Sequence, residues 1–278
     1  MKIAVVAPSN MLSTEVPPKV IALAQARYGA GAPEIVFHPQ CFLSSGHFAG
    51  ADKDREDALV DVANDPTVDA VWCARGGYGA NRIAAAAIKR MSPAARAKPF
   101  LGYSDAGFLL AALLAKGIGR PVHAPMPIDI NREGGNAAVA RSLDWMMLQH
   151  SPRLEYYFGD LPYDTGAQKY AAFNLIVLSA LLGTPLEPDF TGRTLMIEEV
   201  DEAMYRIDRA LFHVTSHPGV RKAAGLMLGR CAPIKPNTPD FGTDEETVTQ
   251  HWCFLSGIPY LGRADIGHDA DNQVVPFG

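Results

Sequence analysis

In the first half of the chain, short apolar runs alternate with longer segments in which apolar residues recur at helical spacing. The runs are hydrophobic at every position, which is typical of parallel strands buried on both faces. Strands that alternate with helices in this way predict an α/β fold built on a parallel sheet. Strands are predicted at 3–7, 34–38, 70–73, 121–123 and in the run that begins at Phe100, and helices at 17–28, 54–63, 79–90, 108–116 and 136–149.

The pattern changes after Gln149. Residues 151–169 are rich in Pro, Gly, Tyr and Asp and have no periodicity. This composition predicts a linker between a domain at 1–150 and a second domain at 170–278. In the second domain, helices are predicted at 173–182, 205–215 and 245–255, and strands at 194–197, 225–229 and 259–261.

Charge and composition exclude several classes of partner. The net charge of −5 and the scattered basic residues argue against nucleic acid and against an acidic membrane surface. No segment approaches the roughly 18 uninterrupted apolar residues of a membrane span. The run Met1–Pro8 is broken too early for a signal peptide, so we expect a cytoplasmic protein. The cysteines lie far apart without a C-x-x-C pair, which disfavours disulfides and zinc; they are Cys41, Cys73, Cys231 and Cys253.

The segment Phe100–Gly107 has the G-x-S-x-[G/A] pattern of a nucleophile elbow, with Gly102 and Ala106 placed two residues on either side of Ser104. The flanking residues must be small because the turn from strand to helix is tight. Such a turn presents the serine hydroxyl at a helix N-terminus, where backbone N–H groups favour developing negative charge. The alternative is that Ser104 only caps the helix that Asp105 opens.

A glycine-rich loop, Arg75–Gly79, follows the predicted strand 70–73 and precedes a helix. Its glycines allow backbone N–H groups to converge on an anion, although a plain tight turn explains the same composition. It matches neither a Walker A loop nor the dinucleotide fingerprint. Beside an elbow on a neighbouring strand it would form an oxyanion hole, with the N–H groups of Gly77 and Asp105 as donors. Arg75 and Gly76 are candidate substrate contacts.

A serine nucleophile needs a general base, which a carboxylate usually orients. His268 lies in a glycine-flanked loop after an apolar strand, whereas His123 ends a predicted strand beside the elbow and competes for the role. Glu198, at the end of strand 194–197, is the natural orienting carboxylate. The acidic cluster that contains it has two other interpretations, a solvated face or a metal or acid–base site. No histidine lies at metal-ligand spacing from the cluster.

The chain resembles the LD-carboxypeptidases, a family of serine peptidases that includes the murein tetrapeptide carboxypeptidase and the microcin C immunity peptidase. Matching motifs run almost from end to end. They are Ala7-Pro8-Ser9, Arg75-Gly76-Gly77-Tyr78-Gly79, Gly102-Tyr103-Ser104-Asp105, Gly183-Thr184-Pro185, Ile197-Glu198-Glu199-Val200, Tyr205-Arg206-Ile207-Asp208-Arg209, Gly267-His268 and Pro276-Phe277-Gly278.

The resemblance implies Ser104 as nucleophile, Glu198 as orienting acid, His268 as base, and Gly77 and Asp105 as oxyanion donors. It also implies a flavodoxin-like N-terminal domain, a smaller β-rich C-terminal domain, a homodimer, and neither metal nor cofactor. The implied reaction releases the C-terminal D-alanine of murein tetrapeptides during cell-wall recycling. Two alternatives stay open: hydrolysis of a peptidyl-nucleotide or related amide, and a module that binds a small anion without reaction.

Two departures from the family pattern bear on the site. Ala172-Phe173 stands where relatives usually have two glycines, so a phenylalanine would narrow whatever space lies beside it. Glu198-Glu199 replaces the more usual Glu-Asp, so either carboxylate could face His268. We choose Glu198 because it occupies the position of the family's glutamate.

Overall fold

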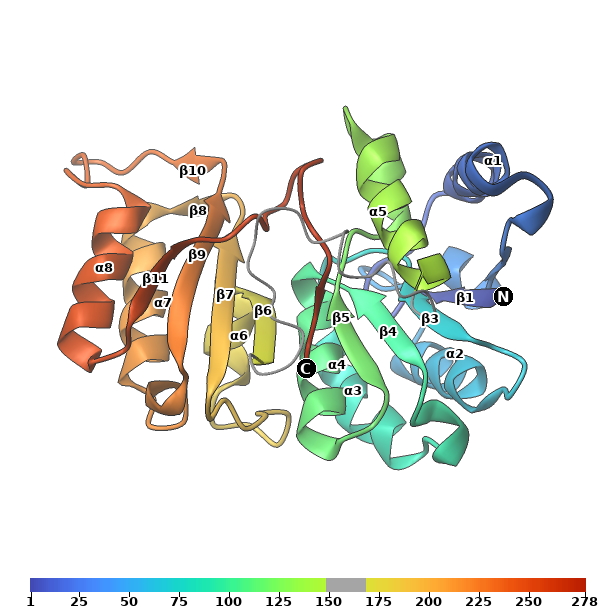
Figure 1. Cartoon of the computed structure of the whole chain (residues 1–278), viewed down its shortest axis with the longest axis horizontal. Helices are drawn as coiled ribbons and strands as arrows, with labels where there is room; N and C mark the ends of the chain where they lie inside the picture. The colour runs from blue at the N-terminus through green and yellow to red at the C-terminus, as the bar shows by residue number, and fades with distance from the viewer. Residues whose placement is uncertain (149–168) are drawn as a thin grey trace.

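A six-stranded, mainly parallel sheet forms the centre of the N-terminal half of the protein (Figure 1). The computed structural model describes residues 1–148 and 169–278. The strand order of this sheet is β12-β5-β4-β3-β1-β2, and every pairing is parallel except that of β12 with β5. The strands are β1 (Lys2–Val6), β2 (Glu34–Phe37), β3 (Ala70–Cys73), β4 (Pro99–Gly102), β5 (Arg120–His123) and β12 (Val275–Pro276).

Helices cover both faces of this sheet, as the hydrophobic strands predicted. One face packs against α2, α3 and α4, and the other against α1 and α5. The strand order reverses at β1, between β2 and β3, and in such sheets ligands bind beyond the carboxyl ends of the strands at that point. The helices are α1 (Val16–Tyr28), α2 (Asp52–Asn64), α3 (Ala80–Lys89), α4 (Gly107–Lys116) and α5 (Gly135–Leu148).

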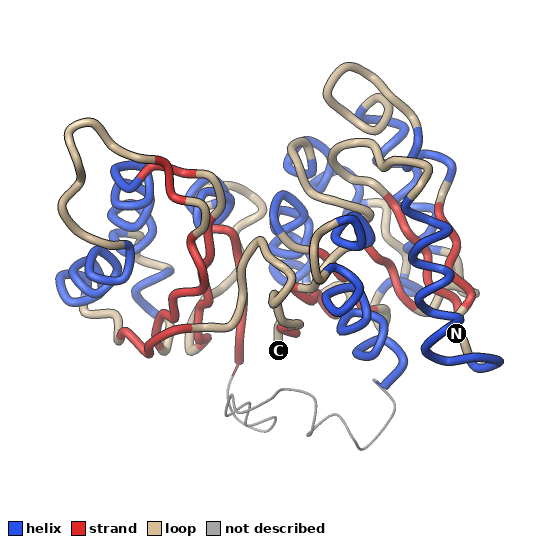
Figure 2. Tube along the Cα trace, turned by 90° about the horizontal axis from the view of Figure 1, so that it is seen from above, coloured by secondary structure: helices blue, strands red, loops and turns tan. Residues whose placement is uncertain are grey.

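The second, smaller sheet has the order β11-β9-β7-β6; all its strands are parallel, and each pairs with the next strand of this sheet along the chain. Right-handed crossovers then place the connecting helices on one face, and Figure 2 shows them gathered there. Its elements are β6 (Lys169–Asn174), α6 (Leu175–Leu181), β7 (Arg193–Glu199), α7 (Met204–Ser216), β9 (Gly225–Cys231), α8 (Glu245–Ser256) and β11 (Tyr260–Arg263), and a separate two-stranded ribbon pairs β8 (Glu202–Ala203) with β10 (Ile234–Lys235).

The two halves share packing. The hydrophobic core under α4 continues into residues of α6, β6 and β7. Gly107, the first residue of α4, packs closely against α6, since a Cβ there would stand only 3.1 Å from Cγ1 of Val177. After β11 the chain crosses back, and β12 adds an antiparallel strand to the edge of the first sheet through Val275 and Pro276. The C-terminal segment therefore belongs to both halves.

The predicted α/β fold with a parallel sheet and a second, smaller sheet is confirmed, and one local assignment is wrong. The predicted helix 173–182 begins only at Leu175, because Phe173 and Asn174 are the last residues of β6. Phe173 is 1 % exposed and packs against Phe190 and Phe277, with ring centroids 6.3 Å and 5.2 Å apart. It fills core space and does not narrow a cleft. The predicted linker lies outside the described residues, apart from Lys169.

Among the described residues, no helix is both long enough and apolar enough to span a bilayer.

Candidate active site

Ser104 stands on a strained turn between β4 and α4. Its φ of 59° lies in the left-handed region, which non-glycine residues adopt rarely and at a cost in strain. The turn is tight: a Cβ at Gly102 would stand 2.9 Å from the Cβ of Ala106 and 3.0 Å from that of Cys73. The short helix η4 (Ser104–Ala106) has Tyr103 at its N-cap, so Ser104 lies inside this helix and does not cap it. These features fit the elbow and exclude the helix-cap interpretation.

The glycine-rich loop lies directly against the elbow. A methyl group at Gly76 would stand 2.9 Å from Oγ of Ser104 and 3.6 Å from the backbone nitrogen of Asp105. Gly77 has a φ of 118°, and a Cβ there would come within 2.5 Å of the Asn10 side chain. Asn10 accepts a hydrogen bond from the backbone N–H of Tyr78 at 3.3 Å. Asn10 therefore supports this loop, which has no space for side chains at Gly76 and Gly77.

The carboxylate of Asp105 ties the elbow to the neighbouring loops. Its Oδ2 accepts hydrogen bonds from Oγ of Ser9 at 2.5 Å and from the backbone N–H of Ala80 at 2.8 Å. Burial raises the pKa of Asp105, although these donors and the Arg55 charge oppose the shift. Arg55 is itself fully buried and donates to the carbonyl oxygens of Pro8 and Gly79. Together these contacts fix the positions of the backbone N–H groups beside Ser104.

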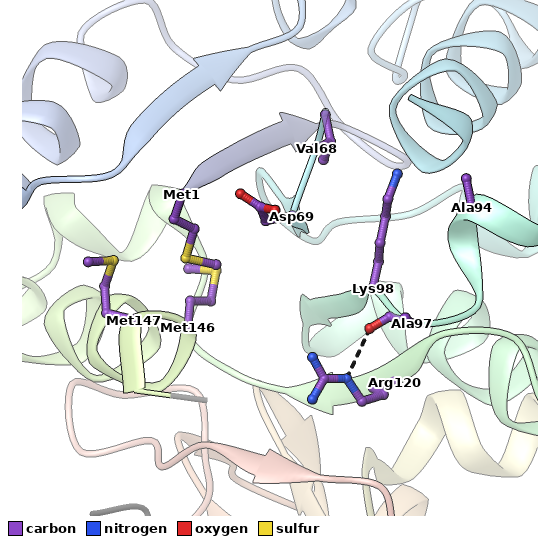
Figure 3. Close-up of a pocket in the computed structure, with 9 residues that line it drawn as sticks. All are labelled: Met1, Val68, Asp69, Ala94, Ala97, Lys98, Arg120, Met146 and Met147. Atoms are coloured by element: carbon purple, nitrogen blue, oxygen red, sulfur yellow. Dashed lines mark hydrogen bonds between the residues drawn. The ribbon is translucent and has the colours of Figure 1, made fainter. Parts of the chain in front are cut away.

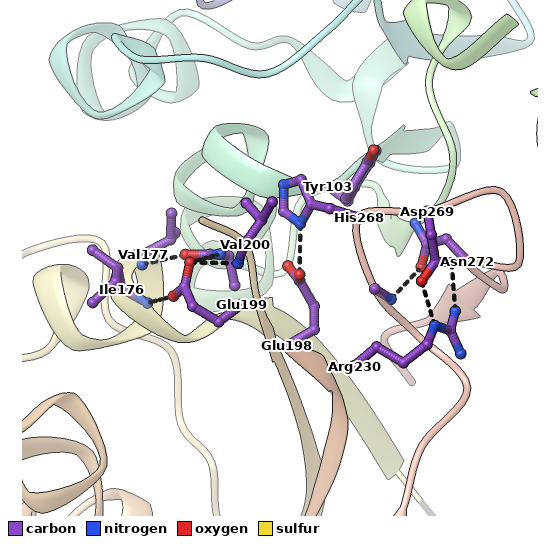
Figure 4. A network of polar contacts seen from close by, with 12 residues as sticks. Tyr103, Ile176, Val177, Glu198, Glu199, Val200, Arg230, His268, Asp269 and Asn272 are labelled. Carbon is purple, nitrogen blue, oxygen red and sulfur yellow. Dashed lines mark hydrogen bonds and ion pairs between the residues drawn. The ribbon is translucent and has the colours of Figure 1, made fainter. Parts of the chain in front are cut away.

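Glu198 and His268 form a buried pair on the other side of the site (Figure 4). The Nδ1 of His268 lies 2.6 Å from Oε2 of Glu198, and the side chains are 8 % and 0 % exposed, respectively. Burial lowers the pKa of His268, but the charge and hydrogen bond of Glu198, with a contribution from Glu199, raise it above the usual histidine value. Oε1 of Glu198 is buried without a partner among the described residues. Of the two adjacent glutamates, Glu198 is therefore the one that faces the histidine.

Glu199 points to the opposite face of β7. It accepts hydrogen bonds from the amide of Asn174 at 2.8 Å and from the backbone N–H groups of Ile176 and Val200, each at 2.9 Å. Burial raises the pKa of Glu199 to about 7. Because the Ile176 N–H belongs to the first turn of α6, Glu199 holds that helix N-terminus in place.

A chain of contacts connects the elbow with the histidine. The ring of Tyr103, directly before Ser104, packs against that of His268 with centroids 4.8 Å apart. The Tyr103 hydroxyl donates to Asp129 at 2.9 Å, and Asp129 accepts from Nε of Arg132 at the same distance. Arg132 also donates to the backbone carbonyl of His268. Ser104 and His268 are thus brought to one site through Tyr103, although no hydrogen bond joins them directly in the described part of the chain.

His123 does not compete as a base. It is 1 % exposed, its Nε2 lies 2.9 Å from Oδ1 of Asn272, and a further hydrogen bond joins it to the backbone of Ala172. Oδ1 of Asn272 also accepts from the backbone N–H of Gly267 at 3.2 Å. His123 therefore stabilises the loop that carries His268.

Arg75 extends from the glycine-rich loop toward the loop after β1, where its Nη1 donates to the carbonyl of Met11 at 3.2 Å. Its Nε is buried without a partner among the described residues.

Sequence reasoning missed the contacts of Tyr103, Asp129, Arg132 and Arg55. Only Arg55 left a signal, since it shares the apolar stripe of its helix with Ala58, Leu59 and Val62.

A hollow of about 510 Å³ lies far from these residues, at the amino ends of β3, β4 and β5 (Figure 3). Its lining includes Asp69, Lys98 and Arg120. The Lys98 ammonium donates to carbonyl oxygens at the C-terminal end of α2. Among the described residues no group of three His, Cys, Asp or Glu side chains is placed to hold a metal ion.

Comparison with known proteins gives consistent matches over both halves. The LD-carboxypeptidase N-terminal domain matches residues 3–124, and the LD-carboxypeptidase C-terminal domain matches residues 171–278. A probable murein peptide carboxypeptidase of Bacillus subtilis is 31% identical over 248 residues, which are 84% of this chain and 74% of that protein. The murein tetrapeptide carboxypeptidase of Pseudomonas aeruginosa is 26% identical over 246 residues, 84% and 78% of the two chains.

Solved structures share the fold. The muramoyltetrapeptide carboxypeptidase from Oxalobacter formigenes superposes with a TM-score of 0.77 at 23% identity, over 99% of this chain and 93% of that one. The microcin C7 self immunity protein MccF superposes with a TM-score of 0.78 at 15% identity, over 100% and 91%. With both domains matched in order and a relative above 30% identity, the chain belongs to the LD-carboxypeptidase family.

Proposed function

We propose that the protein is a serine carboxypeptidase that works through Ser104, His268 and Glu198 without a metal. The observation that carries this proposal is the buried Glu198–His268 pair, which packs against Tyr103 beside the strained Ser104. The left-handed turn presents the hydroxyl, and the carboxylate holds Nδ1 of the imidazole so that Nε2 is available as the base.

In the proposed reaction, Oγ of Ser104 attacks the scissile carbonyl carbon while Nε2 of His268 takes the hydroxyl proton. The backbone N–H groups of Gly77 and Asp105 stabilise the oxyanion, and each such donor is typically worth about 3 kcal/mol in the transition state. The imidazolium then protonates the leaving amine. Water, deprotonated by His268, hydrolyses the acyl-enzyme and regenerates Ser104.

The substrate we propose is a murein tetrapeptide, cleaved at the bond that releases its C-terminal D-alanine. Support comes from relatives named as murein peptide and murein tetrapeptide carboxypeptidases. A role in cell-wall recycling, a cytoplasmic location and a homodimer accompany this proposal. The fold shared with MccF favours a second candidate, hydrolysis of a peptidyl-nucleotide or related amide by the same triad.

An active-serine probe tests the triad. A fluorophosphonate should label the protein at Ser104, and Ser104→Ala should abolish labelling. Ser92→Ala is the matched control, because that serine only caps a short surface helix. Mass spectrometry of a tetrapeptide incubated with the enzyme should then detect free D-alanine. Labelling that persists in Ser104→Ala would refute the nucleophile, and a protein that neither reacts nor cleaves would be a binding module.

A further inference from the structure

A carboxypeptidase must recognise the free carboxylate of the residue that it releases. This requirement applies here because of the proposed function, on which the inference rests. In the proposed mechanism the leaving amine takes its proton from His268, and the carboxylate of the leaving residue is separated from that amine by a single carbon atom. The carboxylate must therefore lie on the histidine side of the site, and not on the side of the oxyanion loop. A buried carboxylate without a partner is costly, so a cation is expected near His268.

Arg132 is placed there. It follows the short helix η5 (Pro127–Asn131) at the carboxyl end of β5, and one Nη1 N–H is bonded to the backbone carbonyl of His268. Its charge is close enough to act on the His268 imidazole, whose pKa it lowers. The side chain is 42% exposed, so it is open to a ligand, unlike the fully buried Arg55.

The guanidinium is also held rigidly. Asp129, which is 1 % exposed, accepts its Nε–H at 2.9 Å and the Tyr103 hydroxyl at the same distance. Arg132 is thereby fixed relative to both the elbow and the base loop. The hydrogen bonds to Asp129 and to the His268 carbonyl leave three of its five N–H donors without an acceptor among the described residues. A planar fork with free donors suits a carboxylate.

The other arginines near the site are less suited. Arg230 is neutralised by Asp265 and Asp269. Arg141 directs its Nε and one Nη to the carbonyl oxygens of Asn272 and Ala270. Arg75 lies on the oxyanion side and is bonded to Met11.

We propose that Arg132 pairs with the terminal carboxylate of the leaving residue and so restricts the enzyme to peptides with a free C-terminus. The interaction both selects the substrate and orients the amine toward His268. Glu198 orients the histidine from one side, and Arg132 orients the leaving group from the other.

The test compares two substrates, L-Ala-γ-D-Glu-L-Lys-D-Ala with a free C-terminus and the same peptide as its C-terminal carboxamide. The wild-type enzyme should prefer the acid by about 30-fold or more in kcat/KM, the scale of a charged hydrogen bond. In Arg132→Gln this preference should fall to about threefold or less. Arg75→Gln and Arg141→Gln are matched controls, in which the preference should persist.

The ratio of kcat/KM for the acid to that for the carboxamide distinguishes substrate recognition by Arg132 from a structural role. A merely structural role of Arg132 would slow both peptides equally and leave the ratio unchanged, which would overturn the inference. If Arg132→Gln does not fold, Arg132→Lys replaces it: the preference should drop several-fold but remain above one, because an ammonium keeps the charge and loses the fork. An unchanged preference in Arg132→Lys would also overturn the inference, as would its loss in Arg75→Gln instead.

Failure of the proposed function has a different signature. A wild-type enzyme that cleaves neither peptide is not a carboxypeptidase of this class, and the role of Arg132 falls with it. Equal cleavage of both peptides would preserve the serine hydrolase and remove carboxylate recognition.

Discussion

Replacing Glu198 with glutamine tests the His268–Glu198 pair directly, because it removes a charge and nearly preserves shape. Oε2 of Glu198 lies 2.6 Å from Nδ1 of His268, and both side chains are buried. Taking the charge centres as about 4 Å apart, an effective dielectric constant of about 20 gives roughly 4 kcal/mol for the attraction between carboxylate and imidazolium. In the proposed mechanism the imidazolium forms as the reaction proceeds, so kcat/KM should fall by about 10³-fold.

The pH profile should move as well, and its direction is diagnostic. A histidine base acts only when it is neutral, so with His268 in the proposed role kcat/KM should fall as pH drops through the histidine pKa. In the wild-type enzyme that pKa is raised by Glu198 against the lowering effect of burial. In Glu198→Gln burial prevails, and the acid limb should shift to lower pH while the plateau falls.

Steady-state rates between pH 5 and pH 9 measure both effects. Glu199→Gln is the control, because Glu199 is adjacent in the chain but faces α6, and its contribution to the His268 pKa is the smaller one. The acid limb should move less in this control than in Glu198→Gln. An acid limb that stays in place in Glu198→Gln, or moves to higher pH, would refute the assignment of the pair.

Three further changes test the supports of the site. Burial raises the pKa of Glu199 to about 7 in the folded protein, so the stabilisation from its protonated form is complete below about pH 4.5 and lost as pH rises through 7. In urea unfolding, the wild-type protein should therefore lose up to roughly 3 kcal/mol of stability relative to Glu199→Gln between pH 4.5 and 8. Gly77→Ala combines positive φ with a clash against Asn10 and should cost about 1–3 kcal/mol by thermal unfolding, of which Asn10→Ala restores only the steric part. Ser9→Ala removes a hydrogen-bond donor from the buried Asp105 carboxylate and should cost about 1–3 kcal/mol of stability, measured as a lower melting temperature. It should also lower kcat, and an unchanged kcat would show that this hydrogen bond does not contribute to catalysis.

Local patterns predicted the parts of the fold that local physics determines. Hydrophobic runs identified the buried strands, and small residues around Ser104 identified a turn that the structure shows to be sterically tight. The strand β6 was missed because Tyr170–Phe173 is short and alanine-rich, and burial by partners distant in sequence decides its conformation.

Residues of the candidate site could be predicted only where they belong to a recognisable sequence motif. Glu198 and His268 were paired from their places after predicted strands and from the family motifs, whereas Arg132 and the His268 carbonyl lie 136 residues apart and share no local pattern. Such contacts arise from the crossing of chain segments in three dimensions, which periodicity does not record. Arg55 could be predicted in part. A charged residue within an apolar helical stripe indicates that it has a buried partner, but the sequence does not identify that partner.

The return of the last strand to the first sheet has a mechanical consequence. Residues 264–274 form a bridge with one end anchored in the second sheet by β11 and the other in the first sheet by β12. His268 stands on this bridge, and its carbonyl is bonded to Arg132 of the first half while its ring is bonded to Glu198 of the second. A rotation of one half against the other would strain the bridge and displace His268. His268 therefore depends on the relative placement of the two halves, because each half supplies one of its two supports.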